Sequence, residues 1–149
     1  MRDRSIDEVK ELDRKMYALK GKNFSDIFDM RYYIVFAVNH RKPIFSNQNL
    51  NRMVSELLRL VCENTGFKCY DIKIYPDYIY LDTYFMSGKD INIACKHIMN
   101  FINKYIVNDF KELINLDITE NSVWYKSPLI KGSKEELEES FDKYLSSVK

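Results

Sequence analysis

Alternating and continuous runs of hydrophobic residues predict the strands of this chain. Residues 31–39 form a nearly unbroken apolar run, rich in β-branched and aromatic side chains, which predicts a central strand buried on both faces. Residues 67–75 and 78–85 alternate apolar and polar positions, and only Pro76-Asp77 separates them. A short break of this kind between two alternating runs predicts an antiparallel hairpin. We expect Ile79 and Leu81 to be buried, since they lie on the apolar side of the second run.

Apolar positions three and four residues apart predict two long helices between these strands. The first follows Ser46, a candidate N-terminal cap, and closes at Gly66. The second spans about 88–108, with Ser87 and Asp90 forming a Ser-x-x-Asp start.

The two ends of the chain also carry helical patterns. A last strand is expected within 122–131, broken at Pro128, and a last helix begins at the Ser133–Glu136 capping box and runs to the C-terminus. Its apolar stripe is Leu137, Phe141, Tyr144 and Val148. Near the N-terminus, a narrow apolar seam predicts a helix over roughly 6–20 that ends at Gly21; the seam is Val9, Leu12, Met16 and Leu19.

From residue 30 onward the predicted order is β-α-β-β-α-β, which is the ferredoxin-like split arrangement. The expected fold is therefore α+β, with an antiparallel sheet, two helices on one face, and the other face open or covered by a partner. We expect residues 1–29 to be an N-terminal helical extension and residues 30–149 to be the domain itself.

Composition and charge narrow the class of protein. The 149 residues are 46% hydrophobic and 14% aromatic, enough for one buried core. The net charge of +1 gives no global case for nucleic-acid binding, so any DNA site must be a local basic patch.

The three cysteines, Cys62, Cys69 and Cys95, lack metal-site spacing and predict buried free thiols. No apolar run reaches membrane-spanning length, and the charged start, Met1–Ser5, does not resemble a signal peptide, so we expect a cytoplasmic protein.

Four segments together carry a family resemblance. They are a strand ending in Asn39-His40-Arg41-Lys42-Pro43-Ile44-Phe45, a helix closing in Leu57–Gly66, the segment Pro76-Asp77-Tyr78-Ile79-Tyr80-Leu81, and Val123-Trp124 followed by the last helix with Lys143-Tyr144-Leu145. In this order and spacing the chain resembles the insertion-sequence 200/605 (IS200-like) transposases of the single-tyrosine HUH superfamily, over most of its length from about Met30.

The resemblance implies a dimeric, ferredoxin-like enzyme that cuts and rejoins single-stranded DNA. In the family, a tyrosine on the last helix attacks a phosphodiester and becomes joined to the 5′ phosphate. A Mg²⁺ or Mn²⁺ ion polarises that phosphate and is held by two histidines, often with a glutamine one turn after the tyrosine.

Residue by residue, Tyr144 matches the nucleophile, Tyr78 and Tyr80 match the two histidines, and Val148 matches the glutamine. The HUH motif is therefore degenerate, and all three expected metal ligands are missing. A neutral phenol with a pKa near 10 is a poor ligand for Mg²⁺. We accordingly expect no metal cofactor, although family members use Mg²⁺ or Mn²⁺. An alternative reading makes Tyr144 a core aromatic on an amphipathic helix, and makes Tyr78 and Tyr80 cross-strand packing residues or a surface for stacking bases.

Four cations are candidate DNA contacts: Arg41, Lys42, Lys126 and Lys131. His40 and His97 have no metal-ligand spacing. Three functions stay open: a homodimeric DNA-binding protein that recognises single-stranded or hairpin DNA without metal-dependent strand transfer, an active transposase that uses Tyr144, and a dimeric scaffold or regulatory protein without DNA binding.

Overall fold

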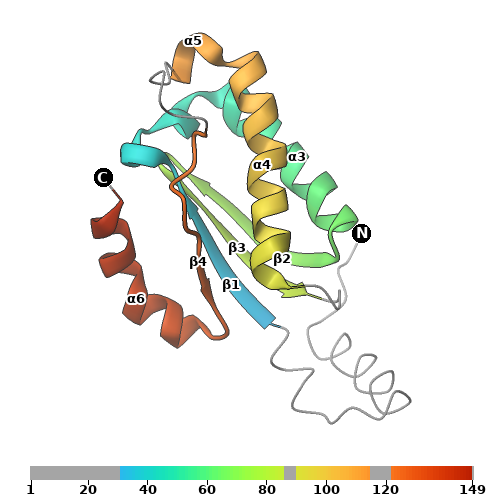
Figure 1. The fold of residues 1–149 in the computed structure, drawn as a ribbon, viewed down its shortest axis with the longest axis vertical. Coiled ribbons are helices and arrows are strands. Elements are labelled where there is room, and N and C mark those ends of the chain that lie inside the picture. The colour runs from blue at the N-terminus through green and yellow to red at the C-terminus, as the bar shows by residue number, and fades with distance from the viewer. Residues whose placement is uncertain (1–30, 86–89, 115–121, 149) are drawn as a thin grey trace.

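The computed structural model describes residues 31–85, 90–114 and 122–148 (Figure 1). The helix expected over 6–20 lies outside these residues. The elements are, in chain order, β1 (Arg31–Ala37), the 3₁₀ turns η1 (Asn39–Arg41) and η2 (Ile44–Ser46), α3 (Gln48–Asn64), β2 (Phe67–Tyr75), β3 (Tyr78–Phe85), α4 (Ile91–Asp109), α5 (Lys111–Ile114), β4 (Leu129–Lys131) and α6 (Lys134–Ser147).

The four strands form one antiparallel sheet in the order β2-β3-β1-β4. The predicted hairpin is confirmed, because β2 and β3 pair from Phe67 opposite Phe85 to Tyr75 opposite Tyr78. A register shift between Cys69 and Asp71 interrupts this ladder. The alternation of strand and helix with this strand order is the ferredoxin-like α+β fold that the hydrophobic pattern predicts.

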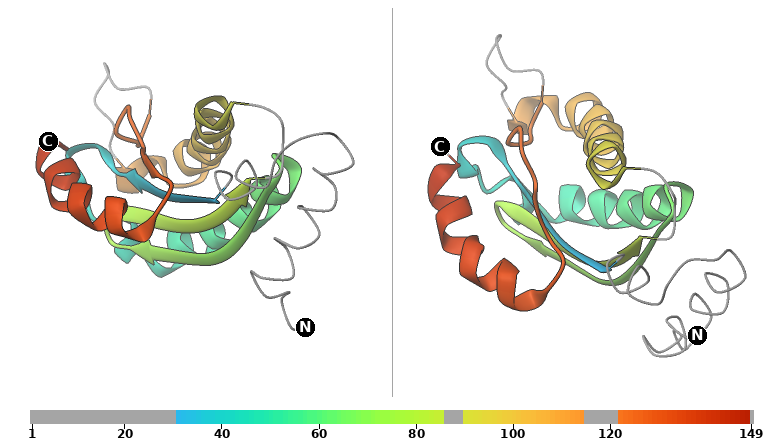
Figure 2. Two further views of the ribbon diagram at one scale, coloured as in Figure 1. Left: turned by 90° about the horizontal axis from the view of Figure 1, so that it is seen from below. Right: turned by 60° about the horizontal axis from the view of Figure 1, so that its bottom comes forward.

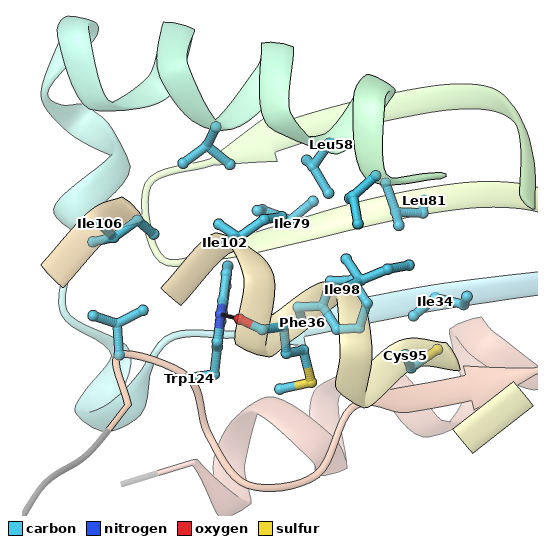
Figure 3. Packing of buried hydrophobic residues seen from close by; sticks show 14 of the residues in the cluster. Ile34, Phe36, Leu58, Ile79, Leu81, Cys95, Ile98, Ile102, Ile106 and Trp124 are labelled. Carbon is cyan, nitrogen blue, oxygen red and sulfur yellow. Dashed lines mark hydrogen bonds between the residues drawn. The ribbon is translucent and has the colours of Figure 1, made fainter. Parts of the chain in front are cut away.

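The main core lies between the sheet and the helices α3 and α4. Ile79 and Leu81 are fully buried there, as predicted, because they point from β3 toward both helices. Figure 3 shows Phe36 of β1 and Trp124 in the same core. The indole N–H of Trp124 donates a 2.9 Å hydrogen bond to the Met99 carbonyl, which satisfies the only polar atom of this buried ring.

The opposite face of the sheet is partly covered by α6 of the same chain (Figure 2). Leu137 and Leu145 of α6 are buried against Tyr33, Val35 and Ala37 of β1. The expectation that this face is open or covered by a partner is therefore wrong where α6 packs on it. The last helix is amphipathic, and its apolar stripe packs on the sheet of its own chain.

One expected helix cap is confirmed, and the starts of two other helices differ from the prediction. The side chain of Ser133 accepts a hydrogen bond from the amide of Glu136 and caps α6. Helix α4 begins at Ile91 rather than near 88, because Asp90 is itself the cap and accepts from the amide of Asn92. The cap of α3 is Asn47, whose side-chain oxygen accepts from the amide of Leu50, because Ser46 is taken up in the preceding 3₁₀ turn. Ser87 lies outside the described residues.

The end of α3 and the last strand follow the sequence signals with one adjustment. Gly66, just past α3, has φ of 87°, the left-handed conformation that favours glycine. The last strand is shorter than 122–131: only Leu129–Lys131 pair as a strand, and Trp124 contributes an isolated bridge to Val38. Pro128 lacks an N–H, which accounts for the interruption between the two.

Two further predictions from the sequence concern the cysteine thiols and membrane-spanning helices. All three cysteines are free; Cys62 and Cys95 are buried, and Cys69 is only partly buried. No helix in the described part of the chain is long and apolar enough to cross a membrane.

Candidate functional site

The four residues that the resemblance matches to catalytic positions, Tyr78, Tyr80, Tyr144 and Val148, meet on the α6 side of the sheet. Tyr78 and Tyr80 point from β3 toward α6, which contributes Phe141 and Tyr144 to the same cluster. Val148, just after α6, is buried in a contiguous cluster with Tyr78 and Tyr144. Alternation along β3 places the two tyrosines on one face, and the four-residue spacing on α6 places Tyr144 and Val148 together. The structure thus assembles the site, but with aromatic and apolar side chains.

The hydroxyl and the ring of Tyr144 each contact another residue of the same chain. Its hydroxyl donates a 2.6 Å hydrogen bond to the carbonyl oxygen of Ser127, and its ring packs edge-on against Tyr125, with centroids 5.9 Å apart. Burial raises the pKa of the Tyr144 phenol, an effect opposed by the backbone amide of Ala37. A backbone carbonyl accepts the phenolic proton in a hydrogen bond but is too weak a base to remove it. The geometry therefore keeps Tyr144 protonated.

The two tyrosines at the histidine positions are also kept neutral. Burial raises the pKa of Tyr80 to about 12, and the nearby carboxylate of Asp82 adds to this effect. Burial likewise raises the pKa of Tyr78, while the charge of Arg41 opposes the shift. With a pKa of about 12, roughly one Tyr80 phenol in 10⁵ is ionised at pH 7.

The residues at these positions do not fit a divalent metal. Mg²⁺ and Mn²⁺ prefer carboxylate, carbonyl and water oxygens, whereas this site offers two neutral phenols and the hydrocarbon side chain of Val148. Among residues 31–85, 90–114 and 122–148, no three His, Cys, Asp or Glu side chains gather closely enough to hold a metal ion. His40 lies in the turn after β1 and His97 on the exposed side of α4, on different elements.

Asp82, a carboxylate two residues after Tyr80, is engaged by Arg31. Two hydrogen bonds of 3.0 Å join the guanidinium Nε and Nη2 to the two carboxylate oxygens, and both side chains are only 11–12% exposed. The Arg31 guanidinium also lies over the rings of Tyr33 and Tyr70, at 5.2 and 5.1 Å from their centroids. A metal at Asp82 would have to displace this bidentate pair.

The candidate DNA contacts are divided between two parts of the sheet. Arg41 lies in the turn after β1, where its Nε donates 2.9 Å to Asp77, and Lys42 follows it. Lys126 lies two residues after Trp124, next to the same end of β1, because the amide of Tyr125 bonds to the carbonyl of Ala37.

Lys131 lies apart from these cations. It pairs with Tyr33 near the other end of β1, about 16 Å from Val38 at roughly 3.3 Å per strand residue. The basic patch at the turn after β1 therefore extends to Lys126 but not to Lys131.

The turn itself has an unusual backbone. His40 and Arg41 both have positive φ, 58° and 52°, a conformation that costs energy for residues other than glycine. The turn is held by hydrogen bonds from Val38 N–H to the Asp77 carbonyl and from Phe45 N–H to the Pro76 carbonyl. These bonds join the turn after β1 to the turn between β2 and β3, directly before Tyr78.

Several residues of the site escape sequence reasoning. The Ser127 carbonyl and Tyr125 come from a segment between β-bridge and strand that has no periodic signal. Arg31 is the first residue of β1, and only the β1–β3 register brings it to Asp82. Phe141 lies on the predicted apolar stripe of α6, but its edge-on contact with Tyr78, at 5.3 Å, depends on how the helix docks.

Similar solved structures share this fold. A candidate transposase from Deinococcus radiodurans R1, known from a crystal structure at 1.90 Å resolution, superposes with a TM-score of 0.69 at 15% identity, covering 78% of this chain and 88% of its own. A REP-associated tyrosine transposase bound to a REP hairpin superposes with a TM-score of 0.52 at 9% identity, covering 81% and 70%. No curated protein sequence matches the chain.

The sequence itself places the chain in a family. The profile of the family described as "Transposase IS200 like" matches residues 26–147, most of the chain. The fold is thus that of the tyrosine transposases, and the chain belongs to the IS200-like transposase family.

Proposed function

We propose that this family member binds single-stranded or hairpin DNA and has lost metal-dependent strand transfer. The observation that carries the proposal is the filling of the catalytic positions. Tyr78, Tyr80 and Val148 pack with α6, and the Tyr144 hydroxyl is bonded to the Ser127 carbonyl. These contacts occupy the positions of the family's metal ligands and hold the matched nucleophile in its protonated form.

The loss of chemistry follows from what a phosphodiester attack requires. The nucleophile must lose a proton, and charge on the phosphate must be stabilised in the transition state. Burial raises the pKa of Tyr144, which works against the first requirement. Phenols with raised pKa at Tyr78 and Tyr80 work against the second, because they cannot supply anionic ligands for a cation at neutral pH.

Retained DNA binding is supported by the family and by the local charge. One solved structure that shares the fold is a tyrosine transposase bound to a REP hairpin. In this chain, Arg41, Lys42 and Lys126 gather at one end of the sheet, which gives phosphates a local basic surface despite the net charge of +1.

A homodimer is part of the same proposal. The edge strand β2, Phe67–Tyr75, pairs only with β3 among the described residues, so one row of its backbone groups is open to another strand. Light scattering over micromolar concentrations is expected to give twice the chain mass of 17.9 kDa. A monomer throughout this range would contradict the dimer and leave the DNA proposal standing.

A scaffold or regulatory protein without DNA binding is the second candidate. It is favoured by the near balance of 23 basic and 22 acidic side chains and by the packed catalytic positions. The two candidates differ in a single measurement, which is binding to nucleic acid.

The deciding experiment is anisotropy of labelled DNA hairpins and single strands, at low and moderate salt, with and without Mn²⁺. We expect salt-dependent binding that Mn²⁺ leaves unchanged, and weaker binding by Arg41→Gln. Lys104→Gln, on the exposed side of α4, is a control that removes one positive charge in the same way. Absence of binding to every probe at low salt would favour the scaffold. Calorimetry that gives a micromolar Mn²⁺ site lost in Tyr80→Phe would contradict the metal-free site.

A further inference from the structure

Tyr75 is an exposed aromatic residue on the sheet side of the molecule. Most of the other large apolar side chains with comparable exposure lie on helices, whereas Tyr75 ends β2 and is 38% exposed. Its position on the strand places it on the same face as Lys73, two residues earlier, which is 55% exposed. The alternating pattern on this edge therefore presents an aromatic ring and a cation side by side.

The ring of Tyr75 is fixed in place rather than merely exposed. It stacks on Tyr78, with centroids 4.6 Å apart and planes 19° from parallel. Tyr78 in turn meets Phe141 of α6 edge-on at 5.3 Å. This column of three rings runs from the covered face of the sheet to the surface, so ordering Tyr75 on binding costs little side-chain entropy.

Two cations belong to the same end of the β2–β3 hairpin as the exposed ring. Lys73 is two residues before Tyr75 on β2, and its ammonium lies 3.6 Å from the Asp71 carboxylate. Arg41 forms an ion pair with Asp77, and this pair occupies one of its five N–H donors. Its partner Asp77 directly precedes Tyr78, the residue on which Tyr75 stacks. The hydrogen bond from Phe45 N–H to the Pro76 carbonyl joins the Arg41 turn to the residue after Tyr75.

We propose that Tyr75 is a stacking platform for an unpaired base of single-stranded DNA, whose phosphates contact Arg41 and Lys73. An aromatic ring offers its face to any base, while a flanking cation attracts the phosphates, which is how single-strand binders combine affinity with sequence tolerance. A fully paired duplex keeps its bases stacked inside and cannot use the ring. The inference rests on the proposed DNA-binding function and adds the residue that distinguishes single strands from duplexes.

The test uses a single-stranded oligonucleotide of roughly 12 nucleotides, within the site sizes of such binders, with one central 2-aminopurine. The fluorescence of this base falls when it stacks on an aromatic ring. We expect binding to quench it, Tyr75→Phe to preserve both quenching and affinity, and Tyr75→Ala to lose the quenching. The affinity of Tyr75→Ala should fall about five- to 150-fold, the range for loss of one base–aromatic stack.

Tyr105→Ala is the matched control, because Tyr105 is 39% exposed and also contacts another ring, Phe101, but lies on α4 in the helical layer. It should leave binding and quenching unchanged. Circular dichroism and thermal melting of each variant check that the fold is retained.

Two failures are distinguishable. If the unmodified protein binds DNA but Tyr75→Ala binds and quenches like the parent, the stacking role is wrong and the proposed function survives. If the unmodified protein binds no DNA, both are wrong. Equal affinity for the single strand and its duplex would also overturn the stacking role.

Discussion

The Tyr144 hydroxyl donates a 2.6 Å hydrogen bond to the carbonyl oxygen of Ser127, so the residue that matches the family's nucleophile is tied to the backbone of its own chain. The ring of Tyr144 packs against Tyr125, and Val148, four residues later, is buried in the same cluster. A residue in this setting contributes to stability, and that contribution can be measured separately from any chemistry.

Replacing Tyr144 should therefore destabilise the fold. Tyr144→Phe removes the hydrogen bond and keeps the ring, and is expected to lower the free energy of unfolding by about 0.5–1 kcal/mol. Tyr144→Ala also removes the packing of a half-buried ring and should cost about 2 kcal/mol or more. Denaturant unfolding measures both, with the exposed Tyr105→Phe as a control expected to stay within about 0.5 kcal/mol of the parent. A Tyr144→Phe variant as stable as the parent would show that the hydrogen bond contributes nothing.

The chain should form no covalent adduct with single-stranded DNA. Loss of one group that stabilises transition-state charge typically costs about 3–4 kcal/mol, on the order of a hundred- to thousandfold in rate, and this site lacks all three of the family's ligands. Denaturing gel electrophoresis after incubation with labelled hairpins and Mn²⁺ is the measurement. A shifted band that disappears in Tyr144→Phe would mean that the enzyme is active.

Introducing the ligands that the family uses tests whether this site can hold a metal ion. The triple variant Tyr78→His, Tyr80→His, Val148→Gln places imidazoles and an amide where the family has them. We expect it to bind Mn²⁺ by calorimetry where the parent does not. The matched variant Tyr78→Phe, Tyr80→Phe, Val148→Leu keeps the cluster apolar and should stay without metal, which separates ligand chemistry from simple repacking.

Alkaline pH should destabilise the fold through the buried phenols. The folded-state pKa of Tyr80 is about 12, above the value near 10 for an unfolded chain, so the folded state binds the phenolic proton more tightly. This stabilisation is fully present below about pH 10 and is lost as the pH rises through about 12. Phenolate absorbance and denaturant unfolding from pH 8 to 12 measure it, and Tyr80→Phe should flatten the loss. A phenol that ionises below pH 9 in the folded protein, with Tyr80→Phe removing it, would contradict the burial.

Asp82, which is paired with Arg31, should contribute more to the free energy of unfolding than Asp71, which lies opposite it in the hairpin. Asp82 accepts two hydrogen bonds from a guanidinium in a nearly buried site, so Asp82→Asn leaves a charge uncompensated and should cost about 3 kcal/mol. Asp71 is paired with Asp82 in the β2–β3 register but is 45% exposed and contacts Lys73 at 3.6 Å. Asp71→Asn should change stability by less than about 0.5 kcal/mol. Equal effects of the two substitutions on denaturant unfolding would show that the bidentate pair is not a stabilising contact.

Local signals were sufficient for most elements of the fold. The hairpin, the burial of Ile79 and Leu81, and the cap at Ser133 depend on alternation, helical period and short-range hydrogen bonds, which are properties of neighbouring residues. The predictions that needed adjustment depend on competition between neighbours. Ser46 lost the cap of α3 to Asn47 because a 3₁₀ turn absorbed it, and Pro128 shortened the last strand.

The amino-acid sequence by itself determined the order of the elements and the family, and it predicts that Tyr78, Tyr80 and Val148 stand at the metal-site positions, because each of these depends on residue type and spacing. Only the tertiary structure decided what those residues do. The docking of α6 on its own sheet brings Phe141 to Tyr78 and the Tyr144 hydroxyl to Ser127, and the β1–β3 register brings Arg31 to Asp82. These contacts join residues that are 17 to 63 positions apart in the sequence. A local pattern cannot predict them, because they depend on how whole elements pack against one another.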